Sequence, residues 1–172
     1  MIDIREIVRQ LAANAATIRA QVQGVSDEQA QWSPNAETWS INQVMEHVYN
    51  EERIDFRKHL KEMLSDPQQP WARFRPDEYV SIVDRRQALD RFLGEREASI
   101  AWLEALRSPD WDRKSEIRFG PDNERMALSA GDVLVSWADH DLAHIRQMVK
   151  LLHAWHVNQA APYSVQYGGG RW

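Results

Sequence analysis

Apolar side chains recur at intervals of three and four residues over four long stretches of the chain, the spacing typical of amphipathic helices. The pattern predicts helices near residues 3–23, 41–65, 81–107 and 129–156. Each helix would have one apolar face to bury, and long helices that do not alternate with strand patterns favour a bundle. The sequence therefore predicts an all-α fold, a four-helix bundle with no sizeable sheet.

Polar residues at the starts of these stretches carry helix-capping signals. Ser40 and Gln43 have the spacing of a capping box, in which each side chain bonds the other's backbone N–H. Ser129 and Asp132 have the same spacing, and Asp3 is a further N-cap candidate. The second and fourth helices are therefore expected to begin next to Ser40 and Ser129.

Two long connections separate the last three predicted helices. Residues 68–79 are proline-rich and are expected to form a loop that serves as a lid or a crossover. Residues 108–128 are expected to be irregular, with an extended piece around 117–119. A short helical turn is expected at residues 26–31, and the tail after about residue 157 should be irregular. The chain has no internal repeat, so a single domain is expected over residues 1–172.

The composition is that of an ordinary globular protein and limits the chemistry. The chain has 172 residues, of which 43% are hydrophobic and 27% are charged. It contains no cysteine, which excludes disulfides, thiolate metal sites and a cysteine nucleophile. Histidine and carboxylate side chains remain as the candidate metal ligands.

Charge and hydropathy exclude several partners. The net charge is −5, from 26 acidic and 21 basic residues, whereas duplex-binding proteins usually carry a basic surplus. We therefore expect no nucleic-acid partner. No apolar run reaches the roughly 18 residues of a membrane span, and the first residues lack the features of a signal peptide. We expect a cytoplasmic protein with no membrane partner.

Two histidines lie one helical turn apart in the fourth predicted helix. On a helical wheel His140 and His144 share a stripe with Trp137 and Met148, at the expected centre of the buried face. Side chains at positions i and i+4 stack on one helix face, so two imidazoles with this spacing can hold one ion. The alternative is a pair of hydrogen-bonded core histidines, which the spacing alone does not exclude.

His47 is the candidate for a third ligand. It lies in the second predicted helix, on the flank of the apolar stripe, and metal sites in bundles are built from facing helices. Three imidazole ligands leave coordination positions open, as in catalytic metal sites. We exclude His153 and His156, which should lie on the surface, and His59, which should lie about 18 Å from His47 along the helix.

Three further residues are candidates for supporting roles. Gln147 follows His144 by one turn and could orient a ligand or a bound water. Glu51 follows His47 by one turn and could be a general base or a fourth ligand, but a solvated carboxylate paired with a nearby Arg or Lys is the preferred interpretation. Asp141 should lie at the edge of the stripe, either as a surface residue or N–H acceptor or as a functional residue.

Two motifs resemble those of the DinB-like family. The first is Glu37-Thr38-Trp39-Ser40-Ile41 followed by Glu46-His47, and the second is the run from His140 to Gln147, of the form His-Asp-x-x-His-x-x-Gln. The run from Ser26 to Pro34, with Trp32 before Ser-Pro, is similar to the family's first interhelical stretch. The resemblance implies a bundle with up-down-down-up topology, a zinc or nickel ion on the three histidines and a homodimer.

The resemblance also implies a function, which the residues alone leave open. Related members include thiol-dependent isomerases and S-transferases, so the chain is expected to use an external low-molecular-weight thiol and a small electrophilic substrate. An open three-histidine metal is equally consistent with a metal-dependent hydrolase of a small substrate. The third alternative is a non-catalytic module that binds a metal or a small molecule. Zinc is expected ahead of nickel, since imidazole suits both ions.

Overall fold

The structure is a computed structural model that describes residues 3–72, 75–119 and 124–168. Its main elements are helices α1 (Ile4–Gln23), α2 (Asp27–Gln31), α3 (Ile41–Glu51), α4 (Arg57–Leu64), α5 (Arg85–Ala105) and α6 (Ala130–Gln159), with strands β1 (Lys114–Phe119) and β2 (Glu124–Ser129). A π-helical turn, η1 (Glu52–Phe56), joins α3 to α4, and short 3-10 turns lie at η2 (Pro76–Glu78) and η3 (Gln166–Gly168). The predicted helical turn at 26–31 is α2, with Ser26 as its N-cap.

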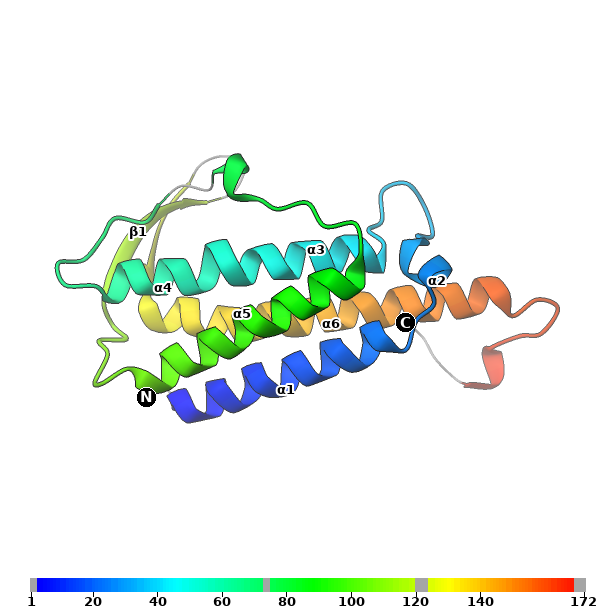
Figure 1. Ribbon diagram of the computed structural model, residues 1–172, viewed down its shortest axis with the longest axis horizontal. Helices are drawn as coiled ribbons and strands as arrows, with labels where there is room; N and C mark the ends of the chain where they lie inside the picture. The colour runs from blue at the N-terminus through cyan, green and yellow to red at the C-terminus, as the bar shows by residue number, and fades with distance from the viewer. Residues whose placement is uncertain (1–2, 73–74, 120–123, 169–172) are drawn as a thin grey trace.

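Four long helical rods form the bundle (Figure 1). The α3–α4 rod and α5 run in the same direction, opposite to α1 and α6, so the topology is up-down-down-up as predicted. Contacts between α1 and α5, α5 and α3, α3 and α6, and α6 and α1 close the bundle. The helices α4 and α5 run the same way, so residues 65–84 must return along the length of the bundle. Of the two roles predicted for this loop, a lid or a crossover, the topology requires the crossover.

Local signals set the helix starts. Both predicted capping boxes are present, at Ser40 with Gln43 and at Ser129 with Asp132. The helix α5 begins at Arg85 rather than near residue 81, because Asp84 accepts a hydrogen bond from the backbone N–H of Arg86 and caps it there. The second helix has the predicted length, but the π-helical turn in its middle was not predicted.

A two-stranded antiparallel hairpin occupies the long connection before α6. The strands pair from Lys114 with Ser129 to Phe119 with Glu124, so the extended piece predicted at 117–119 is the end of β1. The prediction of a mostly irregular segment was wrong over β1 and β2, although the sheet is small as expected. The hairpin lies beside α4, at the end of the bundle where α6 begins (Figure 1).

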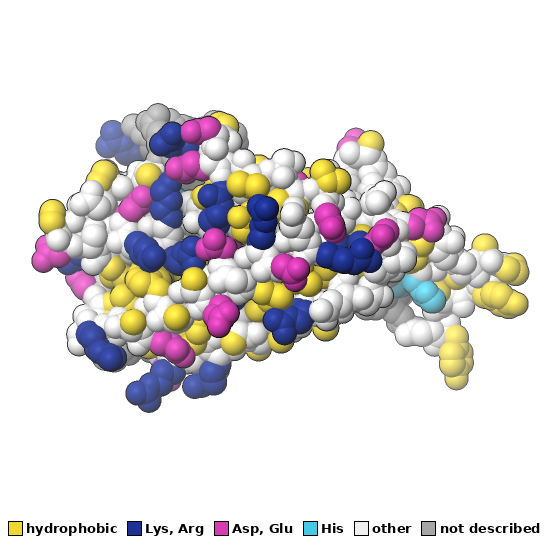
Figure 2. All heavy atoms as spheres, in the orientation of Figure 1, with side chains coloured by type: hydrophobic (Ala, Val, Ile, Leu, Met, Phe, Trp, Pro, Cys, Tyr) yellow, Lys and Arg dark blue, Asp and Glu magenta, His cyan; other side chains and the backbone are white. Residues whose placement is uncertain are grey.

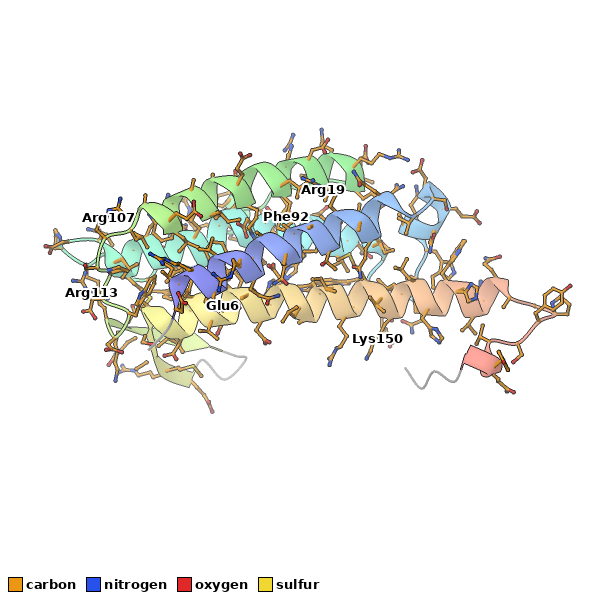
Figure 3. All side chains as sticks on the ribbon, turned by 90° about the horizontal axis from the view of Figure 1, so that it is seen from below. Glu6, Arg19, Phe92, Arg107, Arg113 and Lys150 are labelled. Carbon is orange, nitrogen blue, oxygen red and sulfur yellow. The ribbon has the colours of Figure 1, made fainter. Side chains whose placement is uncertain are left out.

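The surface in view and the interior differ as expected for a bundle. Figure 2 shows basic and acidic side chains interspersed over the face formed by α1 and α5. Figure 3 shows Phe92 of α5 pointing in among the helices, where it is fully buried, while Lys150 of α6 points outward. Among the described residues, no helix combines the length and apolar character needed to cross a membrane.

The buried apolar side chains form two clusters rather than one. One cluster lies toward α2 and includes Ile18, Phe92 and Met148. The other lies toward the hairpin and includes Leu11 and Trp137. Between them the helices bury a layer of polar side chains: Asn14, Glu52, Arg96 and Asp141.

Arg96 is the centre of this polar layer and connects all four rods. Its guanidinium donates to both carboxylate oxygens of Glu52, at 2.9 and 2.8 Å, and to both of Asp141, at 2.6 and 2.9 Å. It also donates to the backbone carbonyl of Leu11 in α1 at 3.0 Å. Trp137 also donates to Oε2 of Glu52 at 2.9 Å, and Asn14 donates to Oδ2 of Asp141 at 3.3 Å. The charges are thus paired and hydrogen-bonded, the condition under which buried ions are tolerated.

We expect Arg96→Ala to lower the free energy of unfolding by about 3–5 kcal/mol, because it leaves two buried carboxylates without a counter-charge. Urea unfolding followed by circular dichroism measures the change. The matched control is Arg91→Ala, an arginine exposed on the same helix, which should change stability by less than about 0.5 kcal/mol. Equal effects of the two substitutions would contradict the role given to the polar layer.

Candidate metal centre

Two antiparallel neighbours, α3 and α6, place the three candidate histidines. The capping box at Ser40 starts α3 so that His47 comes two turns into the helix, on the side that faces α6. His140 and His144 lie one turn apart near the middle of α6. The helix–helix contact thus brings residues that are 93 positions apart in the chain within contact distance.

The imidazoles meet through the same ring nitrogen. Nε2 of His140 lies 3.4 Å from Nε2 of His47 and 3.1 Å from Nε2 of His144. The candidate ligand atoms of the three residues all lie within 4.8 Å of one another, and each residue is half-buried. They form a cluster that could hold a metal ion.

The spacing of the nitrogens provides a test of that fit. Tetrahedral zinc with Zn–N bonds of about 2.05 Å requires ligand nitrogens about 3.3 Å apart. The two measured Nε2–Nε2 distances, 3.4 and 3.1 Å, lie on either side of this value. Imidazole nitrogen is also a donor that zinc and nickel accept. The donor set and its geometry fit a divalent transition metal.

The protonation of the three rings suits metal binding as well. Burial and the charge of His144 lower the pKa of His47 to about 4. Burial and the charges of neighbouring groups lower the pKa of His140 to about 3, and burial lowers that of His144 below its usual range. All three imidazoles are therefore neutral at neutral pH, the form in which histidine binds metal.

Two polar side chains contact the rings on the side away from the cluster. Oε1 of Gln147 lies 2.8 Å from Nδ1 of His144. An Nδ1–H that donates to this oxygen leaves the Nε2 lone pair of His144 directed at the cluster. Oε1 of Glu51 lies 3.7 Å from Nδ1 of His47. Both residues thus lie where a ligand-orienting side chain would be placed.

Glu51 is not the solvated carboxylate that one interpretation of the sequence described. Its side chain is three-quarters buried. Burial raises the pKa of Glu51 to about 8. Asp55 contributes to the rise, because it forms a hydrogen bond with Glu51 and its negative charge repels the ionised carboxylate. A buried carboxyl group with a pKa near neutrality is typical of acid–base sites.

Aromatic rings enclose part of the cluster. The Trp39 ring lies 5.1 Å from the His47 ring and is parallel to that of His144 at 6.5 Å. Phe56, the last residue of the π-helical turn, lies 5.1 Å from the His140 ring on another side. These rings cover part of the histidines, which remain half-buried.

The structure corrects two expectations about α6. The centre of its buried face passes through Trp137, Asp141 and Met148, which are almost fully buried, while His140 and His144 lie on the flank. Asp141 is therefore a core residue bound to Arg96, not a residue at the edge. Asp141 is tolerated at the centre because its ion pair with Arg96 offsets the cost of burying its charge, whereas His140 lies in the wall of a cavity.

The remaining histidines do not join the cluster. His59 is buried away from the cluster. Its Nδ1 lies 2.9 Å from Oε2 of Glu62, and its ring stacks on that of Trp71. His156 is exposed, as expected. His153 is half-buried and lies outside the cluster.

A cavity of about 1060 Å³ opens beside the histidines. It lies between the π-helical turn with α4, the first half of α6, the hairpin, and the loop at Trp71 and Ala72. His140 and Glu51 both form part of its wall. The sequence did not predict this cavity, because the hairpin and the loop that complete it carry no periodic pattern.

The arrangement of rods and histidines defines a class of protein, a four-helix bundle with a candidate metal centre between two helices. The sequence matches the DinB superfamily over residues 10–148, most of the chain. The chain therefore belongs to the DinB superfamily, as its two motifs predict.

A solved structure has the same fold. The chain is similar to YfiT from Bacillus subtilis, described as a probable metal-dependent hydrolase with an unusual four-helix bundle topology. The TM-score is 0.71 at 16% sequence identity, and the match covers 89% of each chain. At this identity the likeness concerns the fold. Among curated proteins, no match was found.

We expect protein purified without a polyhistidine tag and supplied with zinc to hold about one divalent ion per chain. His140→Ala should lose most of this metal, because His140 contributes the nitrogen that lies near both others. His156→Ala, an exposed histidine on the same helix, is the matched control and should retain it. Elemental analysis measures both. Trace metal in the zinc-supplied wild type would rule out the site.

Proposed function

We propose that this protein is a metal-dependent hydrolase of a small substrate, with His47, His140 and His144 as the metal ligands. One observation carries the proposal: the three-nitrogen cluster lies beside a large cavity whose wall contains both His140 and the carboxyl group of Glu51. A divalent ion on three imidazoles acts as a Lewis acid and lowers the pKa of water. The description of YfiT supports the same reaction class.

Glu51 is the proposed acid–base residue. Its pKa of about 8 lets its carboxyl group gain and lose a proton near neutral pH. In the hydrolysis of an ester or amide, Glu51 would take a proton from the attacking water and return it to the departing oxygen or nitrogen. The cluster of candidate ligand atoms contains the three histidines and not Glu51, which argues against a fourth ligand. The place of Glu51 in the cavity wall beside His140 is what supports the acid–base role.

Gln147 is proposed as a positioning residue. The amide oxygen accepts from Nδ1 of His144 at 2.8 Å and is thereby occupied. It is thus suited to hold the ring of His144 in the orientation that a metal requires. Orienting a bound water, the other role considered for Gln147, receives less support from this contact.

Transfer of an external thiol is the second candidate reaction, and the family resemblance favours it. The chain has no cysteine of its own, so the sulfur would come from a separate low-molecular-weight thiol. Soft thiolate ligands and imidazole ligands both suit zinc, which is the metal proposed ahead of nickel. One assay separates this reaction from hydrolysis.

We expect zinc-loaded protein to hydrolyse at least one member of a panel of small esters and amides, with turnover that does not depend on added thiol. Glu51→Gln should reduce this turnover by roughly a hundred-fold or more and leave the metal content unchanged. Glu97→Gln, the same change at an exposed position of α5, should leave both unchanged. Rate measurements and elemental analysis on the three proteins provide the comparison.

Other outcomes select the other functions. Loss of metal in Glu51→Gln would make Glu51 a ligand and remove it as the acid–base residue. Turnover of a model electrophile that requires thiol and is lost in His47→Ala would replace hydrolysis with thiol transfer. Absence of turnover under both conditions would favour a metal or small-molecule binding module.

We further propose that the protein associates as a homodimer, which the family resemblance implies. The apolar side chains of Val135 and Leu142, two turns apart on α6, are 45% and 44% exposed, so they are available for contact with a second copy. Light scattering at micromolar concentration should give twice the monomer mass. A monomer mass over the whole concentration range would refute the dimer.

A further inference from the structure

The cavity beside the histidines is lined mainly by apolar side chains. They come from every surrounding segment and include Ile54, Phe56, Trp71, Ile117, Leu128 and Val133. Such a wall binds the hydrocarbon part of a ligand, because contact removes apolar surface of both partners from water. A volume of about 1060 Å³ has room for a molecule of drug size.

The charged side chains that line the cavity beyond the reacting site are paired or exposed. Lys58 forms an ion pair, and Oδ1 of Asp55 lies 3.3 Å from Nε2 of His59. Asp139 and Glu116 are exposed to solvent. These groups do not offer a buried, unpaired charge to a ligand, so apolar contact is the main basis for binding along this part of the wall.

Trp71 has the largest side chain of the wall, and residues of α4 hold it in place. Its ring stacks on that of His59, with the centroids 3.8 Å apart and the planes inclined by 15°. The backbone N–H of the next residue, Ala72, donates to Oε2 of Glu62 at 3.1 Å. The same oxygen lies 2.9 Å from Nδ1 of His59. Glu62 thus fixes both the ring on which Trp71 stacks and the backbone that follows it.

Further hydrogen bonds join the outer walls of the cavity to one another. Nη1 of Arg113, just before β1, donates to the carbonyl oxygen of Ser65 at the end of α4 at 2.7 Å. Nε2 of Gln68, in the crossover, donates to the carbonyl oxygen of Lys114 in β1 at 2.9 Å. The crossover, the hairpin and α4 are therefore bonded together. A wall that is fixed in this way loses little conformational freedom when a ligand binds.

We propose that the substrate carries a bulky apolar group that fills the cavity and packs on Trp71. The proposal rests on the proposed function for the reacting group, an ester or amide bond placed at His140 and Glu51 in the same cavity. Trp71 is the specificity-determining residue. Glu62 is a positioning residue, which acts through Ala72 and His59.

The neutral fluorophore N-phenyl-1-naphthylamine tests the cavity without any turnover, since its emission rises in apolar surroundings. Titration of zinc-loaded wild type should give saturable binding at micromolar concentration. Trp71→Ala should raise the dissociation constant about ten-fold. Trp102→Ala is the matched control, because Trp102 packs on the same apolar cluster as Trp71 but does not line the cavity, and it should leave binding unchanged.

Glu62 provides a second comparison. Glu62→Ala removes the acceptor for the N–H of Ala72 and should raise the dissociation constant roughly three-fold. Glu62→Gln keeps an oxygen that can accept from this N–H, so it should restore most of the affinity. A rescue of this kind separates the positioning of Trp71 from a general loss of stability.

Met126→Gln tests the wall independently of the core, because Met126 lines the cavity and is 45% exposed. It should raise the dissociation constant roughly three-fold, while Val83→Gln, at an exposed apolar residue that does not line the cavity, should have no effect. Absence of saturable binding to wild type would overturn the proposal. Equal effects of Trp71→Ala and Trp102→Ala, or unchanged binding in Met126→Gln, would also overturn it.

Titration of metal-free wild type, prepared with a chelator, separates this proposal from the proposed function. Probe binding that persists there and depends on Trp71 supports the cavity even where no ester or amide is hydrolysed. Hydrolysis by zinc-loaded protein that does not bind the probe would overturn the proposal for the cavity and leave the proposed function in place.

Discussion

The buried ion network of Arg96 is the constraint on which the rest of the structure depends. A single guanidinium holds carboxylates from the second and fourth rods and a backbone carbonyl of the first, and it lies between the two apolar clusters. Apolar contacts alone would allow the helices to slide along one another, because they have no direction. Paired charges that must stay fully bonded allow one register, and this register also brings His47 to His140.

The π-helical turn connects this network to the candidate metal centre. Glu51 and Glu52 are consecutive, yet Glu51 lies against His47 and the cavity while Glu52 is fully buried against Arg96. At the other end of the turn, Phe56 contacts both the Trp137 ring of the core and the His140 ring of the site. Such turns concentrate at functional sites because they redirect side chains within one helix. Here two consecutive residues of one helical rod have different roles: Glu52 belongs to the core and Glu51 to the candidate metal centre.

Sequence periodicity was sufficient to predict the helices and the pairing of the histidines. It was not sufficient to predict the buried Arg96 network or the cavity. Helix starts follow from capping boxes, and the i, i+4 spacing follows from helix geometry, so His140 and His144 could be predicted to meet. The position of Arg96 in the apolar stripe of α5, four residues after Phe92, is a signal that could have identified the buried network. The cavity had no such signal, since hairpin pairing and loop placement depend on tertiary contacts rather than on local pattern.

The up-down-down-up order separates the parts that build the centre from the parts that shape the cavity. The ligands and the Arg96 network lie on the long helices, which pack against one another along their length. The other walls of the cavity come from segments outside the four rods. Trp71 lies on the crossover between α4 and α5, and the lining residues of the hairpin lie on the connection before α6. Substitutions such as Glu116→Gln can therefore alter the charge and shape of the cavity while the cluster and the core keep their geometry. A change of substrate within this architecture would require changes in the connections and not in the bundle.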